Sequence, residues 1–101
     1  MNHTKWNELF RAFYAEELKP NGRIIPWRIL SVGGFCSPWD DTWTHFGCEP
    51  TAYKSIDRLE IRLTDENRGF VLNQLRRIHV PGEINGEIVT VFGYSQTAEY
   101  L

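Results

Sequence analysis

The dipeptide Asn85-Gly86 constrains the fold of this chain more than any other feature of its sequence. It separates two segments rich in β-branched residues, HVPGEI and EIVTVFGY, and an Asn-Gly pair suits the positive φ angles of a two-residue type I′ turn. The sequence therefore predicts a β-hairpin in which Ile84 lies opposite Glu87, Gly82 opposite Val89, and Val80 opposite Val91. One face of this hairpin then carries Val80, Ile84, Val89 and Val91, and the other carries Ile88, Phe92 and Tyr94.

Another strand is predicted over residues 58–63, where charged and apolar residues alternate strictly. Such alternation is typical of a strand with one buried and one solvated face. The buried face carries Leu59, Ile61 and Leu63, and the solvated face carries Arg58, Glu60 and Arg62. A further strand is expected over residues 23–32, where Pro26 restricts its part of the strand to an edge or a bulge because proline has no N–H to donate.

Helices are predicted where apolar residues recur every three or four positions. The first extends from a cap at Thr4 to Leu18, and its apolar stripe consists of Trp6, Leu9, Phe10, Phe13, Tyr14 and Leu18. The second begins with a cap at Thr64, has Asp65 and Glu66 in its first turn, and buries Val71, Leu72, Leu75 and Ile78. Each stripe is expected to pack against the sheet.

Helix, strands, helix and hairpin in this order predict an α+β fold, a two-layer sandwich in which a mainly antiparallel sheet packs against two helices. The 101 residues form a single domain, residues 1–101, because a second core would need roughly 50 residues of its own. With 42% hydrophobic residues, we expect a folded monomer or small homo-oligomer that needs no metal and no cofactor.

The charge pattern argues against nucleic acid as a partner. The formal net charge is −2, and residues 78–101 contain three glutamates but no Lys or Arg. Non-specific binding to nucleic acid depends on neutralising phosphates, which this chain is poorly equipped to do. No apolar run has the length of a signal peptide or a membrane span, so we expect a cytoplasmic protein that binds no membrane, with Cys36 and Cys48 as mostly buried free thiols.

The segment between Leu30 and Tyr53 is the candidate functional region. It holds the aromatic residues Phe35, Trp39, Trp43 and Phe46 among Asp40, Asp41 and Glu49, and there is no Lys or Arg between Arg28 and Lys54. Within it, residues 42–46 are expected to form a short strand, and residues 52–55 a single helical turn. Either the tryptophans fold down as a satellite core over the sheet, or at least one of them forms a binding surface beside the carboxylates.

Residue types for catalysis or metal binding occur in this segment, but their spacing is not diagnostic. Cys36, His45, Cys48 and His79 could form a zinc site only with unusual spacing, since His45 and Cys48 alone are separated as paired zinc ligands usually are. Cys36, His45 and Asp41 supply the types needed for a small enzyme or ligand-binding domain, which is the alternative interpretation, but no strand-turn-helix elbow surrounds Cys36. We expect no catalytic residue and no metal site.

The segments PWDDTWTHF, AYKSIDRLEI and RRIHVPGEINGEIVTVFGY together resemble a family of small stand-alone bacterial proteins of unknown function. This resemblance covers roughly residues 24–94 and implies a bacterial cytoplasmic setting, without catalytic residues. Small size, acidity and the aromatic-acidic segment also resemble bacterial toxin immunity proteins in a general way. The leading hypothesis is therefore a non-enzymatic protein-binding module, of the immunity type, that meets a basic patch on a toxin through Trp39, Asp40, Asp41, Trp43 and Glu49.

Overall fold

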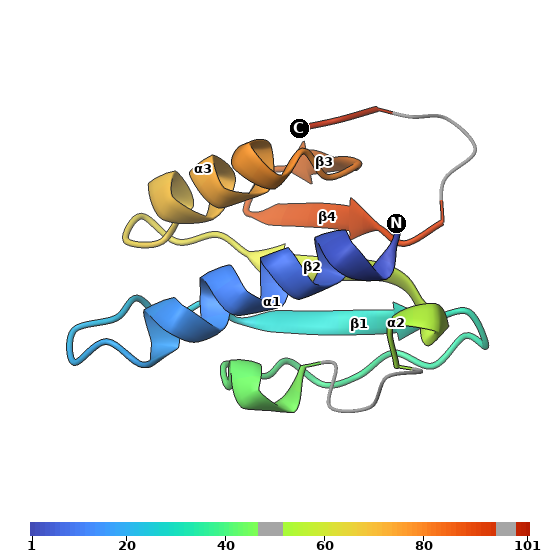
Figure 1. Ribbon diagram of the computed structural model, residues 1–101, viewed down its shortest axis with the longest axis horizontal. Helices are drawn as coiled ribbons and strands as arrows, with labels where there is room; N and C mark the ends of the chain where they lie inside the picture. The colour runs from blue at the N-terminus through green and yellow to red at the C-terminus, as the bar shows by residue number, and fades with distance from the viewer. Residues whose placement is uncertain (47–51, 95–98) are drawn as a thin grey trace.

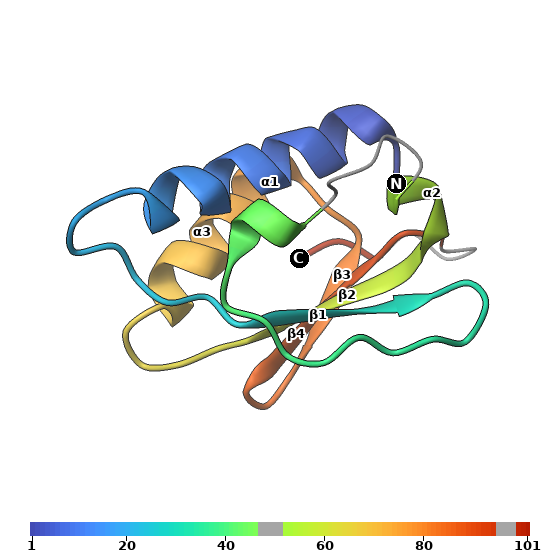
Figure 2. The same ribbon diagram turned by 90° about the horizontal axis from the view of Figure 1, so that it is seen from below.

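The computed structural model describes residues 1–46, 52–94 and 99–101. In this part of the chain, four antiparallel strands form one sheet in the order β1-β2-β4-β3: β1 (Trp27–Ser31), β2 (Ile56–Arg62), β3 (Gly82–Asn85) and β4 (Ile88–Phe92). The helices α1 (His3–Glu17) and α3 (Arg68–Ile78) lie side by side on one face of this sheet (Figures 1 and 2). The fold is a two-layer α+β sandwich, as the sequence predicts.

The β3–β4 hairpin is present, but its predicted register is wrong by two residues. Ile84 lies opposite Val89 and Asn85 opposite Ile88, so Gly86 and Glu87 form the turn. Gly86 has a φ of 62° whereas Glu87 does not have a positive φ, which fits a type II′ turn rather than type I′. Because a shift of two residues preserves the alternation of side chains, Ile84, Val89 and Val91 keep one predicted face, and Ile88 and Phe92 keep the other; Val80 and Tyr94 lie outside the two strands.

The β2 strand and the residue after it confirm the predicted alternation, since Leu59, Ile61 and Leu63 are buried. Strand β1 begins at Trp27 rather than Arg23. Its outer edge is occupied by residues 35–40, which return along it after a turn (Figure 1). The predicted strand over residues 42–46 is wrong: a 3₁₀ helix, η1 (Trp43–His45), occupies this position. The predicted helical turn is confirmed as α2 (Ala52–Ser55).

Both long helices begin at residues other than those predicted. The side chain of Asn2, not Thr4, caps α1 by accepting a hydrogen bond from the backbone N–H of Lys5 at 2.9 Å. Thr64 and Asn67 exchange hydrogen bonds in the turn before α3, and the helix therefore begins at Arg68. Leu18 follows α1 and is 66% exposed, so it does not belong to the buried stripe.

The core between the two layers is rich in aromatic side chains. Trp6, Phe13 and Trp43 are fully buried there, and Phe46 is 2% exposed. The ring centroid of Trp43 lies 4.9 Å from that of Phe13 and 5.5 Å from that of Trp27. The prediction that Trp43 and Phe46 fold down over the sheet is thus confirmed, but they join the main core and do not form a satellite core. No helix in the described ranges has the length and apolar character needed to cross a membrane.

Candidate functional site

The candidate site is built on the segment that follows the outer edge of β1. Backbone hydrogen bonds join Asp40 to Trp27 in both directions, with N···O distances of 2.7 and 2.8 Å. Further along, the N–H of Ser37 donates to the carbonyl of Ile29, and the hydroxyl of Ser37 accepts from the N–H of Ile29. These hydrogen bonds hold residues 37–40 against the edge of β1 in the way that a neighbouring strand is held.

Trp43 anchors the far end of this segment in the core. Its indole Nε1–H donates to the carbonyl of Ile25 at 3.0 Å, and its backbone N–H donates to the carboxylate of Glu17 at 2.6 Å. The side chain is 1% exposed. Trp43, one of the residues predicted to contact a partner, therefore offers no surface to one; its large apolar ring is more stable inside the core than in water.

Trp39 is the tryptophan that remains half-buried at the surface. The guanidinium carbons of Arg28 and Arg62 lie 4.6 and 4.4 Å from its ring centroid, which are cation–π distances. Arg28 also forms an ion pair with Glu60, with Nε and Oε1 separated by 2.7 Å. The sequence analysis did not connect these arginines with Trp39, although the alternation over residues 58–63 already placed Arg62 and Glu60 on the same face.

The neighbouring aspartates have different roles. The Asp40 carboxylate accepts a hydrogen bond from the N–H of Thr42 at 2.8 Å and lies 2.7 Å from Nδ1 of His45. Burial acts to raise the pKa of Asp40, but the hydrogen bonds to His45 and Thr42 outweigh it and lower the pKa below its ordinary value. Asp41 is exposed, and its one hydrogen bond in the described structure is a long contact with the hydroxyl of Thr42 at 3.4 Å. Asp40 thus stabilises the turn that leads to Trp43 through its contacts with Thr42 and His45, whereas the charge of Asp41 is exposed to solvent.

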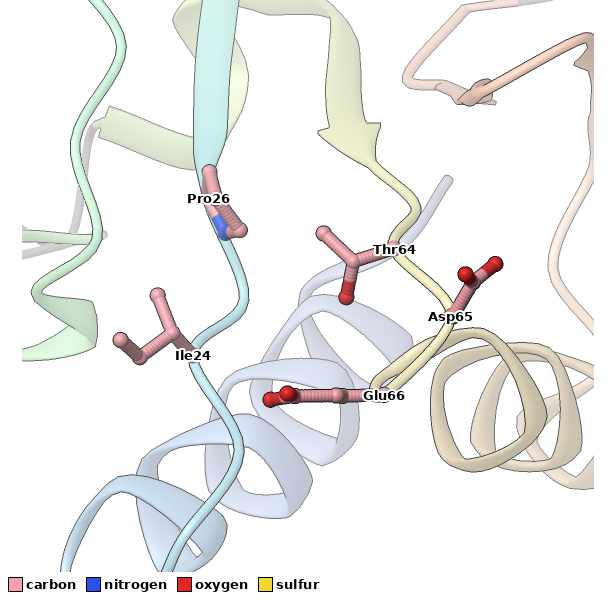
Figure 3. Close-up of a pocket in the computed structure, with 5 residues that line it drawn as sticks. All are labelled: Ile24, Pro26, Thr64, Asp65 and Glu66. Carbon is pink, nitrogen blue, oxygen red and sulfur yellow. The ribbon is translucent and has the colours of Figure 1, made fainter.

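Two cavities adjoin Pro26, the residue before β1. Pro26, Trp39, Asp40 and Asp41 line the first, which has a volume of about 260 Å³. The second has a volume of about 450 Å³ and is lined by Ile24, Pro26, Thr64, Asp65 and Glu66 (Figure 3). Aromatic and aliphatic surface is thus combined with carboxylates on both sides of Pro26.

The sequence model of a family of unknown function (DUF6678) matches residues 1–98. The chain belongs to this family. No curated protein and no solved structure matches the chain. The family description assigns no activity, so the chemistry of the site has to be derived from its own residues.

The alternative set Cys36, His45 and Asp41 is not brought together as a catalytic group. His45 pairs with Asp40 rather than Asp41, and Cys36 is an exposed free thiol whose Sγ lies 3.6 Å from the carbonyl of Ser37. The prediction of a mostly buried Cys36 is therefore wrong. Cys36 lies opposite Leu30 and Asp40 opposite Trp27, which places them at different positions along β1.

The proposed metal ligands are also distributed over the molecule. His79 stacks on Tyr100 with a centroid separation of 4.2 Å beside the start of β3, at the opposite edge of the sheet from residues 35–40. Within the residues that the structure describes, no group of three or more His, Cys, Asp and Glu side chains is arranged to hold a metal ion. Cys48 and Glu49 lie outside the described residues.

Proposed function

We propose that this protein is a non-enzymatic protein-binding module that recognises a basic surface of its partner, and that it acts as a cytoplasmic immunity protein of a bacterial toxin. The observation that supports this most directly is the cavity beside Pro26, where a half-buried tryptophan adjoins the exposed carboxylate of Asp41. A few residues supply most of the affinity in a protein interface, and tryptophan is enriched among them, whereas charged groups at the rim help to select the partner.

The rigidity of this surface favours binding of a folded partner. Residues 37–40 are hydrogen-bonded to β1, and Trp43 holds the following turn in the core. A surface that is already ordered loses little conformational entropy when a partner binds. The positive charge beneath Trp39 is partly compensated because Arg28 pairs with Glu60. Asp41 is then the charge best placed to attract a basic partner.

The test uses the toxin that the immunity hypothesis requires, the product of a gene directly beside the one for this chain. We expect Asp41→Lys to slow association several-fold and to weaken its dependence on salt, because rim charges act mainly on the rate of encounter. Trp39→Ala should weaken binding by about 2 kcal/mol, mainly through faster dissociation. Surface-based binding kinetics measure both effects.

The matched control is Glu8→Lys, an equal change of charge at an exposed position of α1. It should leave association unchanged, and circular dichroism should show that all variants are folded. If folded Asp41→Lys and Trp39→Ala variants bind the toxin as wild type does, the proposed surface is wrong. If the neighbouring toxin kills cells equally with and without co-expression of the wild-type chain, the immunity role is wrong.

A further inference from the structure

The larger cavity, between Ile24 and Glu66, is open to solvent beside Pro26. We propose that it receives an arginine side chain of the partner, whose aliphatic stem lies on Pro26 and whose guanidinium meets the carboxylate of Glu66. This inference rests on the proposed function, because it assigns a second contact of the same partner on the other side of Pro26. Its volume of about 450 Å³ lies in the range of about 300–1,000 Å³ that ligand pockets have.

A buried asparagine fixes the walls of this cavity. Asn67 is fully buried, and its Nδ2 donates to the carbonyls of Ile24 and Arg62 at 3.0 and 3.1 Å. Its Oδ1 accepts from the N–H of Thr64 at 2.8 Å. One side chain thus joins the segment before β1 to the turn before α3, and the cavity exists before any partner arrives.

The walls of this cavity are suited to an amphipathic cation. Pro26 supplies an aliphatic surface, and Ile24, which also lines the cavity, is 65% exposed. The side chain of Glu66 extends across the opening toward the backbone of Ile24, whose own side chain points away from Glu66, and the carboxylate of Asp65 points away from both (Figure 3). Arginine has an apolar stem and a planar charged end that pairs well with a carboxylate, so it matches both kinds of surface.

The arginine that this chain itself places nearby is engaged elsewhere. The Nε of Arg23 donates to the backbone carbonyl of Glu66 at 3.1 Å, and its Nη1 donates to Glu16 at 2.9 Å. Its guanidinium carbon also lies 5.4 Å from the ring centroid of Phe70. Only the backbone carbonyl of Glu66 accepts a hydrogen bond in the described residues, which leaves the Glu66 carboxylate available for an external guanidinium.

Agmatine, which carries a guanidinium and an ammonium at opposite ends of a four-carbon chain, is the probe of this pocket, and N-butylurea is a neutral compound that resembles its guanidinium end. We expect agmatine to shift the amide NMR signals of Ile24, Thr64 and Glu66 in a saturable manner at millimolar concentration. N-butylurea should not shift them. Glu66→Gln should weaken agmatine binding about fivefold, the effect of losing one partly exposed ion pair.

Asp65→Asn is the matched control, because it removes the same charge from a carboxylate that points away from the cavity; it should weaken agmatine binding less than twofold, or about 0.4 kcal/mol. Equal effects of both variants, or equal shifts with N-butylurea, would overturn the pocket. Trp39→Ala separates this inference from the proposed function. It should weaken binding of the toxin but leave agmatine binding unchanged. If agmatine fails to bind but Trp39→Ala still weakens binding of the toxin, the pocket is wrong and the proposed function stands.

Discussion

Replacement of Glu16 by glutamine tests how the chain segment that leads to Ile24, at the larger cavity, is held in place. Glu16 lies near the C-terminal end of α1, and its side chain is 1% exposed. Its Oε2 accepts hydrogen bonds from the backbone N–H of Arg23 at 3.0 Å and from Nη1 of Arg23 at 2.9 Å. Oε1 lies 3.1 Å from the ammonium of Lys19. This carboxylate therefore holds the segment that leads from α1 to Ile24.

The expected loss follows from these contacts. Hydrogen bonds to a charged group contribute about 1 kcal/mol more than neutral ones, so removing the charge from both bonds to Arg23 should cost about 2 kcal/mol. The amide NH₂ of the glutamine introduced by Glu16→Gln is itself a donor and would face the donor groups of Arg23 or Lys19, which cannot accept from it. For a domain of about 100 residues this corresponds to a decrease of about 8–16 °C in Tm.

The pH dependence supplies a second test of the same variant. Burial acts to raise the pKa of Glu16, but the hydrogen bonds from Arg23 and the nearby Lys19 outweigh it, so the pKa lies below its ordinary value of 4.5. A carboxyl group with a lowered pKa stabilises the folded state fully above its unfolded pKa and loses this contribution as pH falls through the folded pKa. The stability difference between wild type and Glu16→Gln should therefore be full at neutral pH and shrink below about pH 4.5.

Urea denaturation followed by circular dichroism measures this difference at several pH values. Glu8→Gln, on the exposed side of α1, is the control and should stay within about 0.5 kcal/mol of wild type. The reasoning is refuted if Glu16→Gln unfolds with the same midpoint as wild type at neutral pH. It is also refuted if the difference between them does not decrease in acid.

Other parts of the structure lead to further predictions. Gly22→Ala should destabilise the fold by about 2 kcal/mol or more, because the new Cβ would lie 1.9 Å from the carbonyl oxygen of Glu16. Gly69→Ala is the control: its Cβ would meet open space, so this variant should be neutral or stabilising in thermal unfolding. Asn67→Ala should cost about 3 kcal/mol in urea denaturation, because it leaves buried backbone groups without partners; a loss below about 1 kcal/mol would contradict this role. Asp40→Asn should lower stability by about 1 kcal/mol at neutral pH, and because the pKa of Asp40 is lowered, this difference should fade below about pH 3.8. Cys36 should react with a thiol reagent in the folded protein as fast as an unfolded peptide thiol does, which comparison with Cys36→Ser measures.

Local patterns in the sequence predicted the elements of this fold well. The alternation over residues 58–63 and the apolar stripes of both helices have one buried face each, and this depends only on the period of the side chains along a strand or helix. The Asn85-Gly86 dipeptide located the hairpin. Its register was decided outside the hairpin, where β4 pairs with β2 and the carbonyl of Glu87 accepts from the N–H of Leu63 at 2.6 Å.

The composition of the candidate site was partly visible in the sequence, but its arrangement was not. Trp39 and Trp43 look alike in an aromatic, acidic segment, and only packing decided that Trp43 enters the core while Trp39 stays at the surface. Likewise, nothing local joins Ile24 to Glu66: these residues line one cavity because Asn67 bonds to a carbonyl 43 residues away. Sequence periodicity reports which face of each element is apolar, whereas contacts between distant segments depend on how the whole core packs.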